Sequence, residues 1–101
     1  MDPLKVIVRH VVKGYSGSAY NGCRYLTINL AGDVFTVVGV EKLNGQRYVT
    51  IGLVVRIADG LVIIERNQNE ISVHEALIAA GIAPKQIIRA YLGEPIPETL
   101  V

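Results

Sequence analysis

The 101-residue chain contains one cysteine, Cys23, and no tryptophan. One thiol cannot form an internal disulfide, and small secreted domains usually carry several bridges. We therefore expect a cytoplasmic protein that is stabilised by an apolar core rather than by disulfides. No apolar run approaches the roughly 20 residues that a transmembrane helix requires. The sequence therefore predicts no membrane-spanning helix.

The chain also lacks a large excess of either charge. Ten Lys and Arg residues are balanced by nine Asp and Glu residues, which gives a formal net charge of +1. Binding to nucleic acids through phosphate contacts usually requires a strongly basic surface. The clearest basic pattern is a line of Lys5, Arg9 and Lys13, spaced four residues apart. This line is either a contact for nucleic acid or an acidic partner, or a solvated helix face. We predict that the chain alone binds DNA weakly.

Residues arranged for chemistry are scarce as well. The two histidines, His10 and His74, have no His or Cys neighbour at the spacing of a metal site. A phosphate-binding loop lies between a strand and the helix that follows it. The glycines near residue 17 are not in such a setting. The sequence therefore predicts no catalytic, cofactor-binding or metal-binding residues, and a protein that is not an enzyme.

What the sequence does contain is enough apolar material for one α+β domain, since half of its residues are apolar. Asp2 and Pro3 are typical of a helix start, and an apolar stripe with a period of 3.6 residues predicts a helix over residues 3–13. Ser72, followed three residues later by Glu75, forms a capping-box pattern and predicts a short helix over residues 73–80.

Between these helices the pattern predicts an antiparallel β-meander of four to five strands. Asn44-Gly45 and Asp59-Gly60 are strong hairpin signals between apolar runs. Residues 15–22 are expected to form a loop. Residues 87–92 are expected to be an edge strand or a brief extended segment, and residues 93–101, which contain two prolines, an extended C-terminal arm.

Regular alternation through the two hairpins assigns the strand residues to two faces. One face is predicted to be core and contains Val34, Val38, Val40, Val49, Ile51, Leu53, Val55, Ile57, Val62 and Ile64. The other face mixes apolar and charged residues, which is typical of an interface. Either a helix of the same chain covers it or a second copy does, and we predict a homodimer in which the second copy contributes to the cover. The candidate interface residues are Phe35, Val37, Tyr48, Val54, Arg56 and Ile63.

An alternative function is that of a small ligand-binding or weakly enzymatic domain. Its pocket would lie between loop 14–23 and the sheet. A deep pocket with convergent polar groups would favour this alternative.

The order of elements is similar to that of a known family. The segments that carry the similarity are "VGVEKLNGQRYVTIGLVVRIADGLVIIERN" and "EISVHEALIAAGIAPKQIIRAYL". The chain resembles the XisI family, cyanobacterial controlling factors for excision of the fdxN element, over about residues 1 to 98. Val40 and Ile63 occupy positions that are aromatic in the family pattern. The resemblance implies a non-catalytic accessory protein that acts through protein contacts, with a companion excision factor or a recombinase as partner. It implies no catalytic residues.

Overall fold

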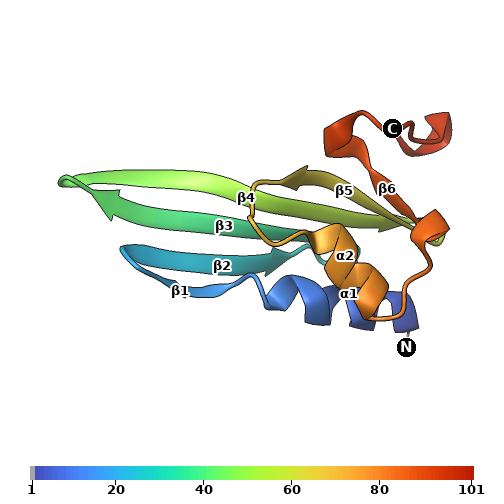
Figure 1. Ribbon diagram of the computed structural model, residues 1–101, viewed down its shortest axis with the longest axis horizontal. Helices are drawn as coiled ribbons and strands as arrows, with labels where there is room; N and C mark the ends of the chain where they lie inside the picture. Colours follow the sequence, from blue (N-terminus) through green and yellow to red (C-terminus); the bar gives the residue numbers. More distant parts are fainter. Residues whose placement is uncertain (1) are drawn as a thin grey trace.

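The computed structural model describes residues 2–101 and has an α+β fold with a single six-stranded sheet (Figure 1). The predicted α+β class is confirmed, but the sheet is larger than predicted and mixed. The strands follow in sequence order across the sheet: β1 Gly17–Ala19, β2 Gly22–Ile28, β3 Val34–Leu43, β4 Gln46–Ala58, β5 Leu61–Asn67 and β6 Ile87–Arg89.

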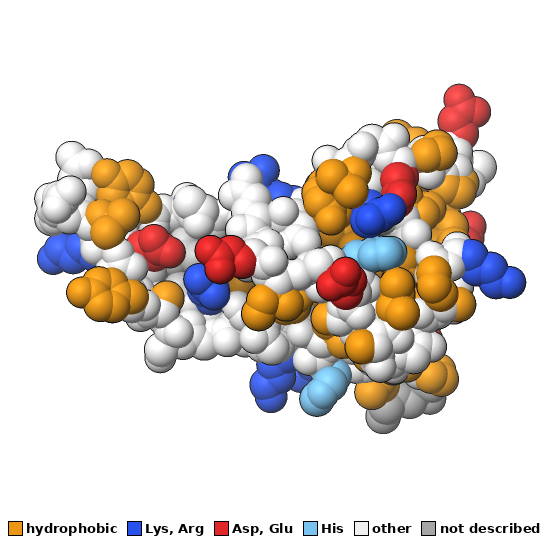
Figure 2. Space-filling model, in the orientation of Figure 1, with side chains coloured by type: hydrophobic (Ala, Val, Ile, Leu, Met, Phe, Trp, Pro, Cys, Tyr) orange, Lys and Arg blue, Asp and Glu red, His pale blue; other side chains and the backbone are white. Residues whose placement is uncertain are grey.

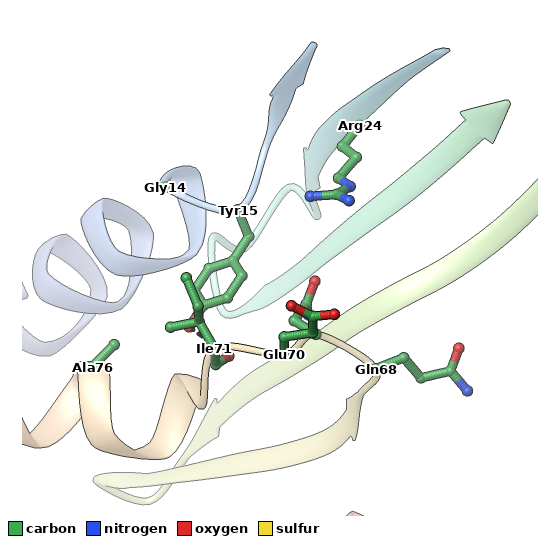
Figure 3. Close-up of a pocket in the computed structure, with 8 residues that line it drawn as sticks. Gly14, Tyr15, Arg24, Gln68, Glu70, Ile71 and Ala76 are labelled. Atoms are coloured by element: carbon green, nitrogen blue, oxygen red, sulfur yellow. Dashed lines mark hydrogen bonds between the residues drawn. The ribbon is translucent and has the colours of Figure 1, made fainter. Parts of the chain in front are cut away.

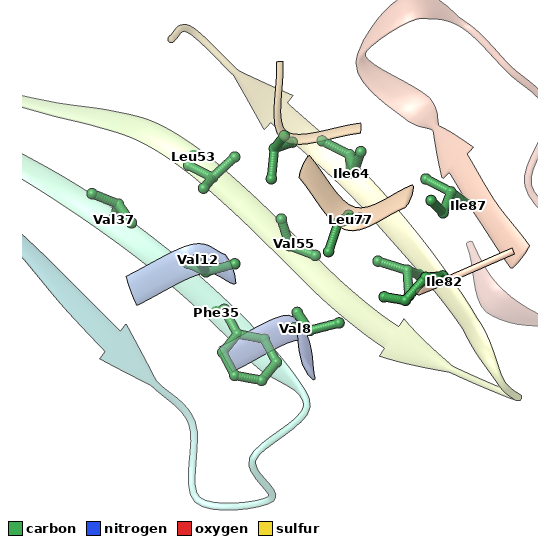
Figure 4. Packing of buried hydrophobic residues seen from close by; sticks show 12 residues of the cluster. Val8, Val12, Phe35, Val37, Leu53, Val55, Ile64, Leu77, Ile82 and Ile87 are labelled. Atoms are coloured by element: carbon green, nitrogen blue, oxygen red, sulfur yellow. The ribbon is translucent and has the colours of Figure 1, made fainter. Parts of the chain in front are cut away.

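Both helices form where the end signals predict them. Helix α1, Pro3–Lys13, begins after Asp2, whose side chain accepts a hydrogen bond from the backbone N–H of Leu4 at 3.0 Å. Helix α2, Val73–Ala79, begins after Ser72, whose hydroxyl oxygen accepts one from the backbone N–H of Glu75 at 3.3 Å. Both helices pack on one face of the sheet (Figure 4).

The two central hairpins also form as predicted. Asn44 and Asp59 have positive φ angles of 51° and 50°, and the glycine after each does as well, which is the conformation of a type I′ turn. The predicted pairs Val40 with Val49 and Val55 with Ile64 are confirmed. The β3–β4 hairpin extends well beyond the helices and gives the molecule its long dimension of 43 Å (Figure 1).

Strands β1 and β6 make the sheet larger than predicted. Residues 17–19, expected to be loop, pair antiparallel with β2. Residues 87–89 pair parallel with β5, so the sheet is not purely antiparallel. The parallel pair depends on α2 and the short 3₁₀ helix η1, Pro84–Gln86, which return the chain to the same end of the sheet.

Two β-bulges overturn the predicted assignment of the faces. Val37 pairs with Leu53 and the next residue, Val38, pairs with Ile51, so Gly52 is an extra residue in β4. The predicted alternation of β4 therefore holds from Leu53 onwards and is reversed from Ile51 back to the hairpin tip. A second bulge places Glu65 as an extra residue in β5, between the pairs of Val54 with Arg66 and Val55 with Ile64.

The core consequently contains residues that regular alternation placed on the other face. Phe35 and Val37 are almost completely buried, with exposed fractions of 1% and 2%, and they pack with Leu53 and Val55 (Figure 4). Val38, Val40, Val49 and Ile51, all predicted to be core, lie on the face that carries no helix. The buried cluster consists of Val8, Val12, Phe35, Val37, Leu53, Val55, Val62, Ile64, Val73, Leu77, Ile82 and Ile87.

Candidate functional site: the open face of the sheet

The face of the sheet opposite α1 and α2, called here the open face, carries a continuous apolar surface. Tyr25, Val38 and Ile51 are aligned in one row across three strands, and Cys23, Val40 and Val49 in the next. These six residues are the apolar patch. Val49 is 67% exposed, Tyr25 53% and Ile51 46%, while the other three are partly buried. Exposed apolar surface of this extent is typical of an interaction site.

Charged residues border the patch at both ends. At the tip of the β3–β4 hairpin, Lys42 pairs in register with Arg47 on the open face. At the other end, Arg56 Nε lies 2.7 Å from Glu65 Oε2, so their predicted proximity is confirmed. An apolar centre with a polar border is the usual composition of a protein–protein interface.

The C-terminal residues contact the open face near Arg56. The Arg56 guanidinium donates a hydrogen bond to the backbone carbonyl of Leu100, in the 3₁₀ helix η3, Glu98–Leu100. Ile63, which pairs with Arg56 in register, is completely buried. Residues 93–101, the C-terminal segment, therefore return to this face and contact it at Arg56 of β4.

The six predicted interface residues are not brought together. Phe35 and Val37 belong to the core, and Ile63 is buried within the chain. Tyr48 is 45% exposed but lies on the helix side of the hairpin tip, opposite Glu41. Val54 and Arg56 lie on the open face at the margin of the patch.

Sequence reasoning missed all six members of the apolar patch. The signal that could have identified them is Gly52, a glycine inside a long β-branched run, which often marks a bulge. Its carbonyl accepts hydrogen bonds from the backbone N–H of Gln68 at 2.9 Å and from Asn69 Nδ2 at 3.2 Å. These hydrogen bonds stabilise the bulge at Gly52.

The predicted basic line lies on α1. Lys5 Nζ donates a hydrogen bond to the carbonyl of Ala31 at 3.0 Å, while Arg9 and Lys13 are exposed. Lys5 and Arg9 line a groove of about 300 Å³ together with Ile28. That the chain alone binds DNA weakly stays a prediction. Figure 2 shows positive and negative side chains interspersed on the face in view, without a large patch of one sign.

A cleft of about 660 Å³ lies between the end of α1, strand β2 and the segment before α2, where the alternative function placed its pocket (Figure 3). Arg24 and Glu70 point into it from opposite walls (Figure 3). Tyr15 donates its hydroxyl hydrogen to the carbonyl of Ile71 at 3.2 Å, and burial raises the pKa of this phenol. The hydroxyl of Tyr15 is thus engaged in a structural bond and is disfavoured as a nucleophile.

Two further features bear on the site. Among residues 2–101, no group of His, Cys, Asp and Glu side chains is arranged to hold a metal ion. Neither of the α-helices in this part of the chain has the length and apolar character that crossing a membrane would require.

The C-terminal segment is anchored by an ion pair whose effect depends on pH. Arg89 donates hydrogen bonds to Glu94 from Nη2 at 2.9 Å and from its backbone N–H at 2.6 Å. These bonds lower the pKa of Glu94. A lowered folded pKa adds stability above the unfolded pKa, about 4.3 for Glu. This stability is lost as the pH falls through the folded pKa.

We therefore expect wild type to be more stable than Glu94→Gln at neutral pH, with a difference that shrinks as the medium is acidified towards about pH 3. Thermal unfolding of both proteins at stepwise pH measures this. Glu98→Gln is the control, because Glu98 is an exposed carboxylate of the same segment. A constant difference at every pH would contradict the assigned role of Glu94.

Comparison with known proteins identifies the family. The family model described as XisI protein matches residues 3–97. The chain belongs to the XisI family. This XisI family member has the fold of a crystal structure of a XisI-like protein from Anabaena variabilis ATCC 29413, with a TM-score of 0.73 and 16% identity over 84% of this chain and 81% of that one.

A second solved structure shares the XisI fold. It is the fdxN element excision controlling factor XisI from Anabaena variabilis ATCC 29413, with a TM-score of 0.68 and 18% identity over 94% of this chain and 92% of that one. No curated protein matches the chain. The resemblance recognised in the sequence is therefore confirmed at the level of family and fold.

Proposed function

We propose that this XisI family member is a non-catalytic accessory factor that controls excision of a DNA element by a site-specific recombinase. The observation that carries the proposal is the family match over residues 3–97. It is supported by the fold shared with a protein named as an excision controlling factor. The proposed partners are the recombinase, a companion excision factor, or both.

The surface supports action through protein contacts rather than through DNA. The open face presents an apolar patch with Tyr25 and Val49 more than half exposed. The net charge of +1 gives little general attraction for phosphate. The cleft beside Arg24 offers polar groups, yet its one phenol, Tyr15, is engaged with the carbonyl of Ile71.

An excision assay tests the proposal. The gene is deleted in the native host, and the fraction of chromosomes carrying the excised junction is measured by quantitative PCR. We expect at least about a tenfold change on deletion, restored by a plasmid copy. The control expresses the same plasmid in a host without the recombinase, where no junction should form. An unchanged junction frequency in the deletion strain would refute the proposed function.

Purified protein provides the second arm of the test. Incubated alone with DNA that spans the element boundary, it is expected neither to cut nor to join strands. It should also bind duplex DNA weakly at physiological salt in fluorescence anisotropy, because phosphate contacts dominate such binding and the chain is nearly neutral. Strand cleavage would contradict a non-catalytic role, and tight binding would contradict action through protein contacts.

A further inference from the structure

The apolar patch consists of two rows of unequal size. One row contains Tyr25, Val38 and Ile51, and the other contains the smaller set Cys23, Val40 and Val49. The helices of the chain lie on the opposite face, and the C-terminal segment reaches only to Arg56. The described elements of the chain therefore leave this patch uncovered.

We propose that a second copy of the chain covers the patch, with the two open faces packed together across a two-fold axis that is perpendicular to the strands. This axis passes between the two rows and exchanges them. Tyr25 then lies over Cys23 of the second copy, and Ile51 lies over Val49. Each larger residue meets a smaller one, which allows two sheets to pack at the usual separation of about 10 Å.

The sizes of the residues select this direction of the axis, because an axis parallel to the strands along β3 would place Tyr25 over Ile51 of the second copy. An axis parallel to the strands would place Lys42 and Arg47 against the same residues of the second copy, and like charges in contact are unfavourable. The perpendicular axis places these cations over the row of Thr36 and Val54, which continues into Arg66 on β5, while Glu65 beside this row is paired with Arg56. The patch is therefore complementary to itself in size. A closed two-fold dimer is also the commonest assembly of a small chain.

The mass of the wild-type protein is the first test. Light scattering at tens of micromolar should give twice the monomer mass of 11.0 kDa. Ile51→Glu should weaken self-association by about a hundredfold, because it places a carboxylate at an apolar centre. The matched control is Tyr48→Glu. Tyr48 is in the same strand and 45% exposed against 46% for Ile51, but it lies on the other face. A monomeric wild type, or equal loss in both variants, would overturn the proposal.

Cys23 provides a test that needs no substitution in the patch. Its thiol is free and only partly exposed, and in the dimer it would lie beneath Tyr25 of the second copy. Alkylation of Cys23 should slow as wild-type protein is concentrated through the dissociation constant, and should stay fast in Ile51→Glu. A rate that is independent of concentration in wild type would overturn the proposal.

Cross-linking tests the direction of the axis. In a Cys23→Ser background, the double variant Thr36→Cys, Lys42→Cys should give covalent dimers with a short bismaleimide, because the axis exchanges these two positions. Each single variant should give far fewer. Equally efficient cross-linking of Lys42→Cys alone would show parallel strands and overturn the arrangement. Self-association is independent of the proposed function, so a dimer without an effect on excision refutes only the latter.

Discussion

Replacing Phe35 by alanine is expected to lower the free energy of unfolding by about 3–5 kcal/mol, the range for removing a buried aromatic ring. Phe35 is 1% exposed and lies beside Val8 of α1 in the core (Figure 4). Val38→Ala should cost about 1 kcal/mol or less, since Val38 lies on the open face and is only partly buried. The sequence pattern alone predicts the opposite order.

Urea unfolding monitored by circular dichroism measures both losses. The two substitutions should be compared in the Ile51→Glu background, so that self-association does not contribute to either value. The result that would falsify the assignment of the faces is a larger loss for Val38→Ala than for Phe35→Ala. Comparable losses would show that the bulge at Gly52 does not decide which of these side chains is buried.

The features that the sequence predicts well are those with local causes. Helix α1 follows from its cap and apolar stripe, and the β3–β4 hairpin follows from the Asn44-Gly45 turn. A two-residue turn also fixes the register beside it, so the pairs nearest each turn are correct. The resemblance to the family rests on the order of these elements. It could therefore be recognised from the same local signals.

The features that the sequence predicts poorly depend on distant partners. The bulge at Gly52 is held by Gln68 and Asn69, which belong to a later part of the chain. Strand β6 forms only because α2 and η1 carry it back to β5. One extra residue reverses every later side chain of a strand. Because of this one bulge, the exposed residues of the candidate site differ from those that regular alternation predicts.

The existence of a second apolar face was nevertheless predictable. Apolar residues are too frequent in β3 and β4 for one buried face to contain them all, and this excess does not depend on register. Val54 and Arg56 were assigned to this face, and they lie there because the predicted alternation of β4 holds after Gly52. The identity of the exposed residues between the hairpin tip and Gly52, such as Ile51, required the structure.

The second large effect is expected at Gly22, where β2 begins and passes very close to β3. A Cβ atom at this position would lie 1.9 Å from the backbone oxygen of Val40 and 2.8 Å from Cα of Glu41. Real side chains essentially never approach backbone this closely, so Gly22→Ala must separate the two strands locally. We expect a loss of about 3 kcal/mol, the upper end for overpacking.

The damage should be localised in the β1–β2 hairpin. Gly22 pairs with Ala19 on one side and Glu41 on the other, so its displacement affects both neighbouring strands. Hydrogen exchange should therefore accelerate most at the amides of residues 17–24, while α2 keeps its protection. Gly39→Ala is the matched control. Its Cβ would meet the Thr50 hydroxyl at 3.2 Å, and a side chain can rotate away where backbone cannot. If Gly39→Ala costs as much as Gly22→Ala, the close approach of β2 to β3 is not what requires glycine at position 22.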